Sequence, residues 1–361
     1  MNTIRYDILG VIYINKLIIH KDILSDNLEK IKANFPNKTL IYVAKANAYG
    51  LGIDVVLPTI LKFTRFITVA NFEEASEIKQ KFPHTAVSTL LPLNESETIE
   101  SVKLGNILSI TNLQELQNTI AVCKNKSLIP KIQLKINSGM NRFGFDNKAE
   151  LENALNLCFS NSVEIIGVFT HLSASDFEFS RRQIAKFVEI VGGHKVKSHI
   201  TLNNFTAYSK AVGFDGIRSG IITIGGEENL LQTKQCFELC SEILELRKIE
   251  IGEYVGYNFG YQAKKAMTVA VVGIGYADIS IRNLSNCGKV IVNGKKCDII
   301  GYICMDVMFV DVTNCAAKKG DNVTIIGFDC DNDIKAVAKK LNTISYEVLT
   351  SISNRVKRVE K

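Results

Sequence analysis

Short β-branched runs alternate with amphipathic stretches of helical period from about residue 38 to residue 225. This alternation predicts repeated βα units around a parallel sheet. Roughly eight such units favour a closed (β/α)₈ barrel over an open sheet, although periodicity alone does not separate the two. The predicted strands are residues 40–45, 66–70, 86–91, 107–110, 131–136, 165–172, 199–203 and 217–224.

Two of the intervening stretches carry clear helix signals. Asn71 is followed three positions later by Glu74, which is the capping-box arrangement of a helix start. Leu113, Leu116 and Ile120 recur at the spacing of one apolar helix face.

The pattern changes after about residue 236, where strand-like runs are separated by Gly, Asn and Asp turns with few helices between them. One late stripe at Ile334, Val337, Ala338 and Leu341 predicts a helix. We therefore expect an α/β fold with an N-terminal extension (1–12), a TIM-type barrel (13–235) and a mainly β C-terminal domain (236–361).

Composition is typical of a folded protein, with 46% hydrophobic and 22% charged residues among 361. The net charge of +6 is spread along the chain without a basic block, which argues against a nucleic-acid partner. No apolar stretch is long enough to span a bilayer, so we expect no membrane partner. The apolar run at residues 7–14 imitates a secretory signal, but Asn15 and Lys16 interrupt it and no small-residue cleavage site follows.

The nine cysteines form no CxxC pair and no Cys/His zinc spacing. We expect no metal site. An odd number of cysteines, most of them in apolar segments, suits reduced thiols in a cytoplasmic protein.

Lys45 ends an apolar strand and is followed by Ala-Asn-Ala-Tyr-Gly, which places its amine where a barrel opens its catalytic face. Burial lowers the pKa of such an amine and yields the neutral form that attacks aldehydes. The alternative is a lysine whose amine simply reaches solvent from a strand end.

Residues 44–50, AKANAYG, closely resemble the pyridoxal-phosphate lysine motif of the alanine racemase family. The resemblance implies that Lys45 carries pyridoxal 5'-phosphate and that Tyr49 binds its phosphate. Leu51 stands where the family usually has histidine.

Residues 135–145, KINSGMNRFGF, are similar to a second segment of that family. The resemblance implies that Arg142 donates to the phenolic oxygen of the cofactor and contacts the substrate, a role that suits a permanently charged planar donor. It also implies that Lys135 braces this arginine and can be carbamylated. Asn137 replaces the usual aspartate.

Residues 170–176, THLSASD, and the stretch from His199 to residue 226 resemble two further segments. His171 would bridge a catalytic tyrosine to Arg218, and Arg218 would face the pyridine nitrogen. A guanidinium keeps its proton, so the cofactor becomes a weaker electron sink and simple proton exchange is favoured. The phosphate would be bound by Asn204, which replaces the family's serine, and by the backbone of Gly220 and Ile221.

Three segments of the predicted β-domain complete the resemblance. VGIGYADISIR, residues 272–282, implies that Tyr276 is a second base, with Ile279 where glycine is usual. ICMDVMFVDVT, residues 303–313, implies that Met305 and Asp306 bind substrate, the Met305 backbone holding its carboxylate; Tyr302 replaces a common arginine. Tyr346, in the closing segment, would complete the phosphate site.

Taken together, the resemblance implies a racemase that interconverts L- and D-alanine and supplies D-alanine for the cell wall. Lys45 would serve the D-isomer face and Tyr276 the L-isomer face, because inversion needs a base on each side of the carbon. Relatives supply the tyrosine from the partner subunit, which implies a head-to-tail homodimer with shared active sites.

Three alternatives stay open. Leu51, Asn137, Asn204, Ile279 and Tyr302 depart from the family pattern, so the enzyme could be a broader racemase or one for serine or basic amino acids. A fold-related basic amino-acid decarboxylase fits poorly with Arg218. A non-catalytic pyridoxal-phosphate-binding protein would need only the barrel, so Tyr276 and the β-domain argue against it.

Overall fold

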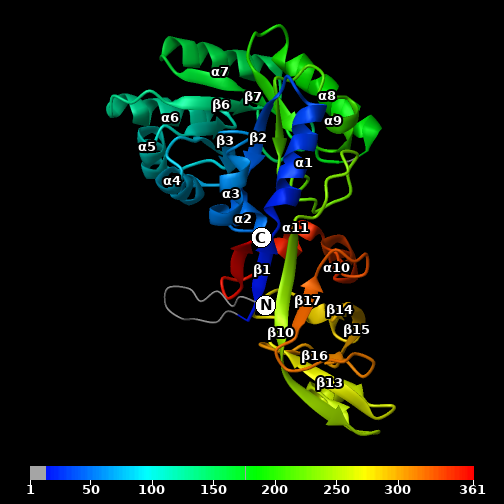
Figure 1. Cartoon of the computed structure of the whole chain (residues 1–361). Helices are drawn as coiled ribbons and strands as arrows, with labels where there is room; N and C mark the ends of the chain where they lie inside the picture. The colour runs from blue at the N-terminus through cyan, green and yellow to red at the C-terminus, as the bar shows by residue number, and fades with distance from the viewer. Residues whose placement is uncertain (1–13, 175) are drawn as a thin grey trace. The chain divides into compact units, whose positions relative to one another are not determined.

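The computed structural model describes residues 14–174 and 176–361 (Figure 1). The chain forms two compact units. One comprises Ser25–Tyr49 and Val56–Thr233, and the other comprises the residues up to Leu24, Gly50–Val55 and Lys234–Lys361. The expected N-terminal extension, 1–12, lies outside the described residues. No helix of the described chain is long and apolar enough to cross a membrane.

Eight parallel strands close the first unit into a barrel, which confirms the (β/α)₈ prediction. The last strand pairs with the first, with Ile41 opposite Arg218. The strands are β2 (Thr39–Val43), β3 (Phe66–Val69), β4 (Ala86–Thr89), β5 (Ile107–Ile110), β6 (Lys131–Lys135), β7 (Glu164–Phe169), β8 (Ser198–Thr201) and β9 (Gly216–Ser219).

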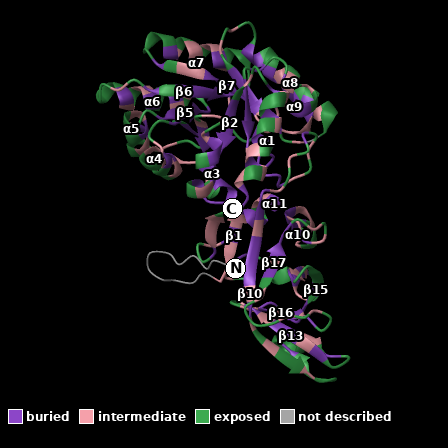
Figure 2. Ribbon diagram, viewed as in Figure 1, coloured by how far each residue is buried: buried purple, intermediate pink, exposed green. Residues whose placement is uncertain are grey.

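Helices follow the strands around the barrel (Figure 1). Figure 2 shows the barrel strands largely buried and the helices presenting exposed faces to solvent. Because amphipathic helices bury one stripe against the sheet, this is the packing that their sequence pattern predicts. The helices are α1 (Lys21–Asn34), α2 (Lys45–Tyr49), α3 (Ile53–Ile60), α4 (Phe72–Lys81), α5 (Glu95–Lys103), α6 (Leu113–Asn125), α7 (Lys148–Ser160), α8 (Phe177–Val191) and α9 (Asn204–Tyr208).

The helix predicted at Asn71 is α4, and the Asn71 side chain accepts from the Glu74 backbone N–H at 3.0 Å. In a complete capping box the Glu74 carboxylate would accept from the backbone N–H of Asn71, and here it does not. It accepts instead from the backbone N–H groups of Ala70 and Ala46, each at 2.7 Å. Glu74 therefore ties α4 to the segment that follows β2.

Five predicted strands run two or more residues past the observed strand ends, and two of these differences concern the site directly. The strands predicted over 86–91, 165–172 and 199–203 end at Thr89, Phe169 and Thr201. The strand predicted over 217–224 ends at Ser219, and residues 220–226 form turns closed by the bonds Thr223 N to Gly220 O (2.9 Å) and Gly226 N to Ile221 O (3.0 Å). The strand predicted to end at Lys45 stops at Val43, and Lys45 begins α2. In both places a residue after the strand end is buried, Ala44 in one and Ile221 in the other, although its backbone has left the sheet.

The second unit is mainly β, as expected. Six strands pair into a closed ring, β10–β13–β16–β15–β14–β17, in which β10 pairs with β17 through residues 239–242 and with β13 through residues 243–249. Its strands are β10 (Phe237–Ile249), β11 (Tyr254–Val255), β12 (Tyr261–Gln262), β13 (Met267–Val272), β14 (Lys289–Val292), β15 (Lys295–Ile300), β16 (Met308–Asp311), β17 (Asn322–Ile326) and β18 (Lys357–Glu360). Two 3₁₀ turns, η1 (Tyr257–Phe259) and η2 (Arg282–Leu284), and two helices, α10 (Ile334–Lys340) and α11 (Ser345–Thr350), complete it.

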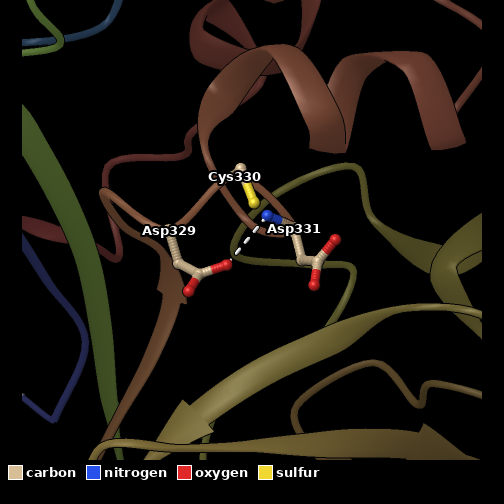
Figure 3. A group of neighbouring side chains, drawn as sticks. All are labelled: Asp329, Cys330 and Asp331. Atoms are coloured by element: carbon tan, nitrogen blue, oxygen red, sulfur yellow. Dashed lines mark hydrogen bonds between the residues drawn. The ribbon is translucent and has the colours of Figure 1, made fainter.

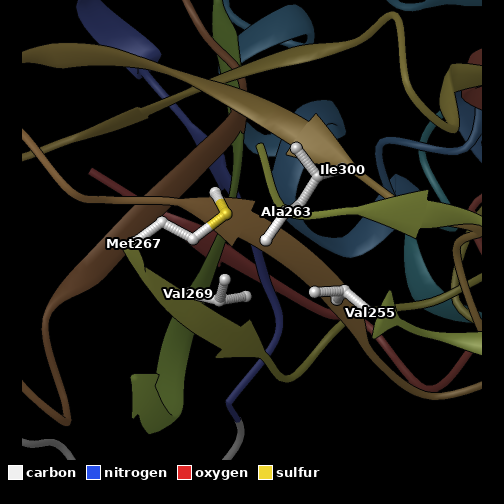
Figure 4. Packing of buried hydrophobic residues seen from close by; sticks show 5 residues of the cluster. All are labelled: Val255, Ala263, Met267, Val269 and Ile300. Atoms are coloured by element: carbon white, nitrogen blue, oxygen red, sulfur yellow. The ribbon is translucent and has the colours of Figure 1, made fainter. Parts of the chain in front are cut away.

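Part of this unit's core is a cluster of five buried residues contributed by strands and the loops between them (Figure 4). Phe309, Tyr261 and Ile249 pack against it from partly buried positions. The members are Val255, Ala263, Met267, Val269 and Ile300. The predicted helix stripe is also found, because Ile334, Val337 and Ala338 are the buried residues of α10.

The observed division differs from the boundaries expected at residues 13 and 235. Strand β1 (Lys16–Ile19) pairs antiparallel with β10 and parallel with β18, so it belongs to the sheet of the mainly β unit. Residues 50–55 group with the same unit. Sequence periodicity identifies a strand but not the strands with which it pairs, which explains the difference.

Candidate active site

Lys45 opens an unusual turn. Ala46, Asn47 and Ala48 have φ of 51°, 54° and 54°, and Tyr49 follows at 57°, so α2 is a left-handed turn. For L-residues this conformation costs about 1–2 kcal/mol per residue. The bond from the Ala46 N–H to Glu74 helps to hold the strained turn.

The surroundings of Lys45 favour a neutral amine. Burial lowers its pKa most, the Arg142 guanidinium lowers it further, and Glu74 acts in the opposite direction. A lowered pKa increases the fraction of free amine at neutral pH, which is the form that attacks a carbonyl carbon.

Lys135, at the end of β6, adds to this positive charge. Its side chain is 5% exposed, and its amine lies 5.3 Å from the centroid of the Phe143 ring. Burial, followed by Arg142, Arg218 and Lys45, lowers the pKa of Lys135 to about 8. Since Arg142, Arg218 and Lys45 all act on the pKa of Lys135, these four residues form one cationic group. A group with this charge suits an anionic ligand.

Arg218, from β9, is 3% exposed and lies 4.9 Å above the centroid of the Phe169 ring. Its Nη1 donates to Nδ1 of His199 at 2.6 Å, and its Nη2 donates to the Thr170 carbonyl and to Oγ1 of Thr201. No carboxylate forms an ion pair with it within residues 14–174 and 176–361. Burial lowers its pKa to about 9, so the guanidinium remains charged at neutral pH.

His171 is connected to Arg218 through Thr201. The Thr201 hydroxyl accepts from Arg218 at 3.0 Å and lies 2.6 Å from Nδ1 of His171. The Thr201 hydroxyl is free to donate its one proton to this nitrogen, in which case the proton of the neutral His171 ring is on Nε2. Burial and the neighbouring cations, Arg218 first, lower the pKa of His171 to about 3, so the ring is neutral.

Tyr49 and Gly220 approach each other closely. A Cβ at position 220 would overlap the Tyr49 phenol, so this position requires glycine. Burial raises the pKa of Tyr49, which therefore stays protonated and can donate a hydrogen bond. Gly220 and Ile221 lie in the turn after β9. The side-chain oxygen of Asn204 accepts from the Leu230 N–H at 3.0 Å, which leaves its amide NH₂ as a donor.

The remaining predicted site residues lie in the mainly β unit. Backbone bonds of 3.0 Å from Tyr276 to Cys304 and from Ala277 to Met305 hold the Tyr276 loop against the segment of Met305 and Asp306. The side chains of Tyr276 and Met305 are 39% and 53% exposed, so both can reach a ligand. Tyr346 lies in α11.

Arg355 links the two segments that carry Tyr276 and Asp306. Its guanidinium lies 2.8 Å from Oδ1 of Asp306 and 3.5 Å from Oδ1 of the buried Asp278. The Asp306 carboxylate therefore already has a cationic partner. This ion pair favours a structural contribution of Asp306 at the Tyr276 loop.

One other group resembles a ligand set. Asp329, Cys330 and Asp331 bring a thiol and two carboxylates together, and the Asp331 N–H donates to Oδ1 of Asp329 at 3.0 Å (Figure 3). The Lys296 ammonium lies 2.9 Å and 2.7 Å from the two carboxylates. The Asp331 N–H and then Lys296 lower the pKa of Asp329, and Lys296 lowers the pKa of Asp331. The lysine supplies the positive charge, so this exposed group is explained as an ion-pair cluster.

Sequence reasoning missed four residues that are connected to the barrel site: Glu74, His199, Thr201 and Gln133, whose Oε1 lies 2.9 Å from Nε2 of His199. A signal for three of them is present, because side chains two apart on a barrel strand point to the same side. His199 and Thr201 have this spacing on β8, and Gln133 and Lys135 have it on β6. Glu74 has no such signal, since its carboxylate acts on a neighbouring segment.

Comparisons with known proteins agree with the motifs. The alanine racemase N-terminal domain matches residues 19–228, and the alanine racemase C-terminal domain matches residues 236–360. The alanine racemase of Fusobacterium nucleatum is 32% identical over 358 residues, which cover 94% of this chain and 98% of that protein.

Solved structures agree over the same length. Alanine racemase from Clostridium difficile superposes with a TM-score of 0.90 at 26% identity, covering 97% of this chain and 96% of that one. Alanine racemase from Bartonella henselae, a structure with covalently bound pyridoxal phosphate, gives 0.86 at 27% identity, covering 96% and 99%. Both domain matches and the full-length likeness show that the chain belongs to the alanine racemase family.

Proposed function

We propose that this protein interconverts L- and D-alanine with pyridoxal 5'-phosphate bound through Lys45. The observation that carries the proposal is the amine of lowered pKa at the barrel mouth, grouped with Lys135, Arg142 and Arg218. The names of the relatives support alanine as the substrate.

The barrel residues fit this cofactor. Its phosphate is an anion, which the cationic group attracts, and the Tyr49 phenol and the Asn204 amide both offer donors. Gly220 has no side chain, so its backbone faces the same region directly. When bound, the cofactor acidifies the Cα–H of an attached amino acid.

The chain's own residues then move the proton. The neutral Lys45 amine takes or returns it on the D-isomer face, and the Tyr276 phenol does so on the L-isomer face. Arg218 keeps its proton because it remains charged, which limits electron withdrawal at the ring nitrogen and suppresses transamination. His171, neutral with its proton on Nε2, would donate toward the phenol.

We also propose a homodimer in which Tyr276 acts in the active site of the partner subunit. The mainly β unit exposes several large apolar side chains, which a partner subunit would cover. They are Ile251, Tyr254, Tyr257, Phe259, Tyr276, Tyr302 and Met305.

The proposed setting is the cytoplasm, where D-alanine would supply cell-wall synthesis. All nine cysteines are free thiols, which suits a reducing compartment.

Carbamylation of Lys135 is part of the proposal. With a pKa of about 8, a substantial fraction of this amine is neutral and able to add carbon dioxide. The resulting carbamate would place an anion beside Arg142. Asn137, where relatives have aspartate, contributes no charge; its amide instead donates to Asn141 and Asp146.

The decisive experiment incubates the pure protein in heavy water with each L-amino acid. We expect D-alanine with deuterium at Cα to form fastest from L-alanine, and borohydride to trap the cofactor on Lys45. Faster turnover of serine or a basic amino acid would identify the broader racemase, and carbon dioxide release would identify a decarboxylase. Bound cofactor without any turnover would identify a binding protein.

The variant Tyr276→Phe tests the second base. It should keep the visible absorbance of the cofactor and lower racemisation of L-alanine by about 10²- to 10⁴-fold, the usual contribution of a general base. Tyr208→Phe, which changes another exposed tyrosine outside the proposed interface, is the matched control. Unaffected turnover in Tyr276→Phe would remove Tyr276 from the mechanism.

A further inference from the structure

A line of buried polar groups runs from Arg218 away from the mouth, through the interior of the barrel. His199 lies between Arg218 and Gln133, with its Nε2 2.9 Å from Oε1 of Gln133. The Gln133 NH₂ donates to Oγ of Ser109 at 2.8 Å, and the Ser109 hydroxyl donates to the carbonyl of Thr89. Gln133 and Ser109 are 1% and 2% exposed, and neither has a part in the proposed chemistry.

The groups at the two ends of this line determine which partner donates and which accepts in each of its hydrogen bonds. A guanidinium has donors only, so Nδ1 of His199 must accept and carries no proton. Burial and Arg218 hold the pKa of His199 well below its usual value, so the ring is neutral and its proton is on Nε2. Nε2 must therefore meet an acceptor, and Gln133 must present its oxygen.

The far end of the line agrees with this assignment. With its oxygen toward His199, Gln133 turns its NH₂ toward Ser109, whose hydroxyl then donates to a carbonyl that can only accept. Rotating the amide by half a turn would set its NH₂ against the N–H of His199. The network therefore permits one arrangement of protons.

Position and protonation of His199 depend on different neighbours. Its ring stacks on Phe169, with centroids 5.1 Å apart and planes 4° from parallel. This stack holds the ring in place whichever nitrogen carries the proton. The choice of nitrogen depends on Gln133.

We propose that Gln133 is a positioning residue for Arg218, because its amide oxygen holds His199 in the tautomer that accepts from Nη1. The inference rests on the proposed function, in which Arg218 faces the pyridine nitrogen. If His199 leaves this tautomer, Nη1 of Arg218 loses its acceptor. The orientation of the guanidinium at the pyridine ring then becomes less defined.

Two variants separate the roles of the amide. Gln133→Met keeps the length of the side chain and removes both polar atoms. Gln133→Glu keeps an acceptor for the N–H on Nε2 of His199 in either protonation state of the carboxyl. Thr89→Val is the matched control, because the buried Thr89 hydroxyl has no hydrogen-bond partner in the described chain and its carbonyl is retained.

The first readout is independent of activity. The holoenzyme labelled with ¹⁵N-histidine has only five histidines, and His199 can be assigned with His199→Asn. We expect a neutral ring protonated on Nε2 in the parent protein, Gln133→Glu and Thr89→Val, and a mixture of tautomers in Gln133→Met. A proton on Nδ1 in the parent, or unchanged signals in Gln133→Met, would overturn the proposal.

The second readout is kinetic. Gln133→Met should lower kcat for alanine about tenfold with KM changed less than about twofold, while Gln133→Glu stays within about threefold of the parent. Equal kcat in Gln133→Met and Thr89→Val would also overturn the proposal. If Gln133→Met does not fold, Ser109→Ala, which removes the acceptor of the Gln133 NH₂, should shift the same signals.

Failure of the proposed function has a separate signature. A parent protein that racemises no amino acid would still give the His199 spectrum. The tautomer assignment and the racemase assignment can therefore be rejected independently.

Discussion

Replacing Gly220 with alanine places a methyl group where the Tyr49 phenol lies. A Cβ built at position 220 overlaps the phenol oxygen and lies 2.7 Å and 2.8 Å from the ring carbons Cζ and Cε2. Because Tyr49 is 5% exposed, the ring has no solvent into which it can turn. The ring, the turn after β9, or both must move.

The size of the effect follows from these contacts. Forcing a methyl group into a packed interior costs about 1–3 kcal/mol, and the three nearest atoms all belong to one rigid ring. The less flexible unfolded chain of an alanine variant offsets about 0.4–1 kcal/mol. We expect a net loss of about 1–2 kcal/mol in the free energy of unfolding.

Cofactor binding should weaken in the same variant. If the displaced phenol loses a hydrogen bond to a charged phosphate, the loss is about 1.5–3 kcal/mol. Since each 1.4 kcal/mol is about tenfold in Kd, pyridoxal phosphate should bind about 10- to 100-fold more weakly. Urea unfolding measures the first effect, and an absorbance titration of the cofactor-free protein measures the second.

Gly193→Ala is the control, because a Cβ at position 193 meets no atom within 4 Å. It should change the stability by less than about 0.5 kcal/mol. The double variant Tyr49→Phe with Gly220→Ala removes the nearest atom, so the two changes should couple by about 1 kcal/mol. If Gly220→Ala unfolds and binds cofactor like Gly193→Ala, the close approach of Tyr49 to position 220 is refuted.

Two further predictions concern the left-handed turn and the neutral histidine. Ala46→Gly should raise the free energy of unfolding by about 0.5–1 kcal/mol, since glycine adopts the φ of 51° at this position without strain. Ala121→Gly in the regular helix α6 should instead lower the free energy of unfolding by about 1 kcal/mol. Urea unfolding of both variants measures whether the two changes have opposite signs. The pKa of His171 is about 3 in the folded protein and about 6.5 in the unfolded chain, so stability should be lost as the pH falls from about 6.5 towards 3. Between pH 7.5 and 5.5 the parent should lose about 1 kcal/mol more than His171→Asn, and equal losses would contradict a neutral His171.

The barrel was predictable because its signal is local. Each strand is a short apolar run and each helix has its own stripe and cap, as at Asn71, so alternation alone indicated the fold. The same reasoning misplaced the end of β9, because Ile221, Ile222 and Ile224 are buried in turns. An apolar run predicts that its residues are buried, but it does not determine their backbone conformation.

The lysine turn shows a second limit. Of its residues after Lys45, Asn47 is of a type that favours positive φ, while Ala46 and Ala48 disfavour it. The strained conformation is held by Glu74, which lies 28 positions from Ala46 in the chain. No local pattern could have predicted it; only the resemblance of the motif singled out Lys45.

The contacts among site residues depend on closure of the barrel. Gln133 and His199 are 66 positions apart, yet their side chains meet inside it. Thr201 lies between Arg218 and His171, a link that the resemblance had placed directly between the arginine and the histidine. Motifs identified which residues gather, and the folded barrel determines which atoms touch.

The charges at the barrel mouth explain why an anion belongs there. Besides burial, Arg142 lowers the pKa of Lys45, and Arg142, Arg218 and Lys45 lower the pKa of Lys135; Glu74 is the acid that opposes these effects at Lys45. Like charges held together destabilise the folded state unless an opposite charge joins them. The chain partly relieves this repulsion through Lys135, which releases its proton near pH 8, whereas Arg218 stays charged. A phosphate, a substrate carboxylate and a carbamate are anions that would relieve the rest, which supports the proposal that the cationic group binds an anion.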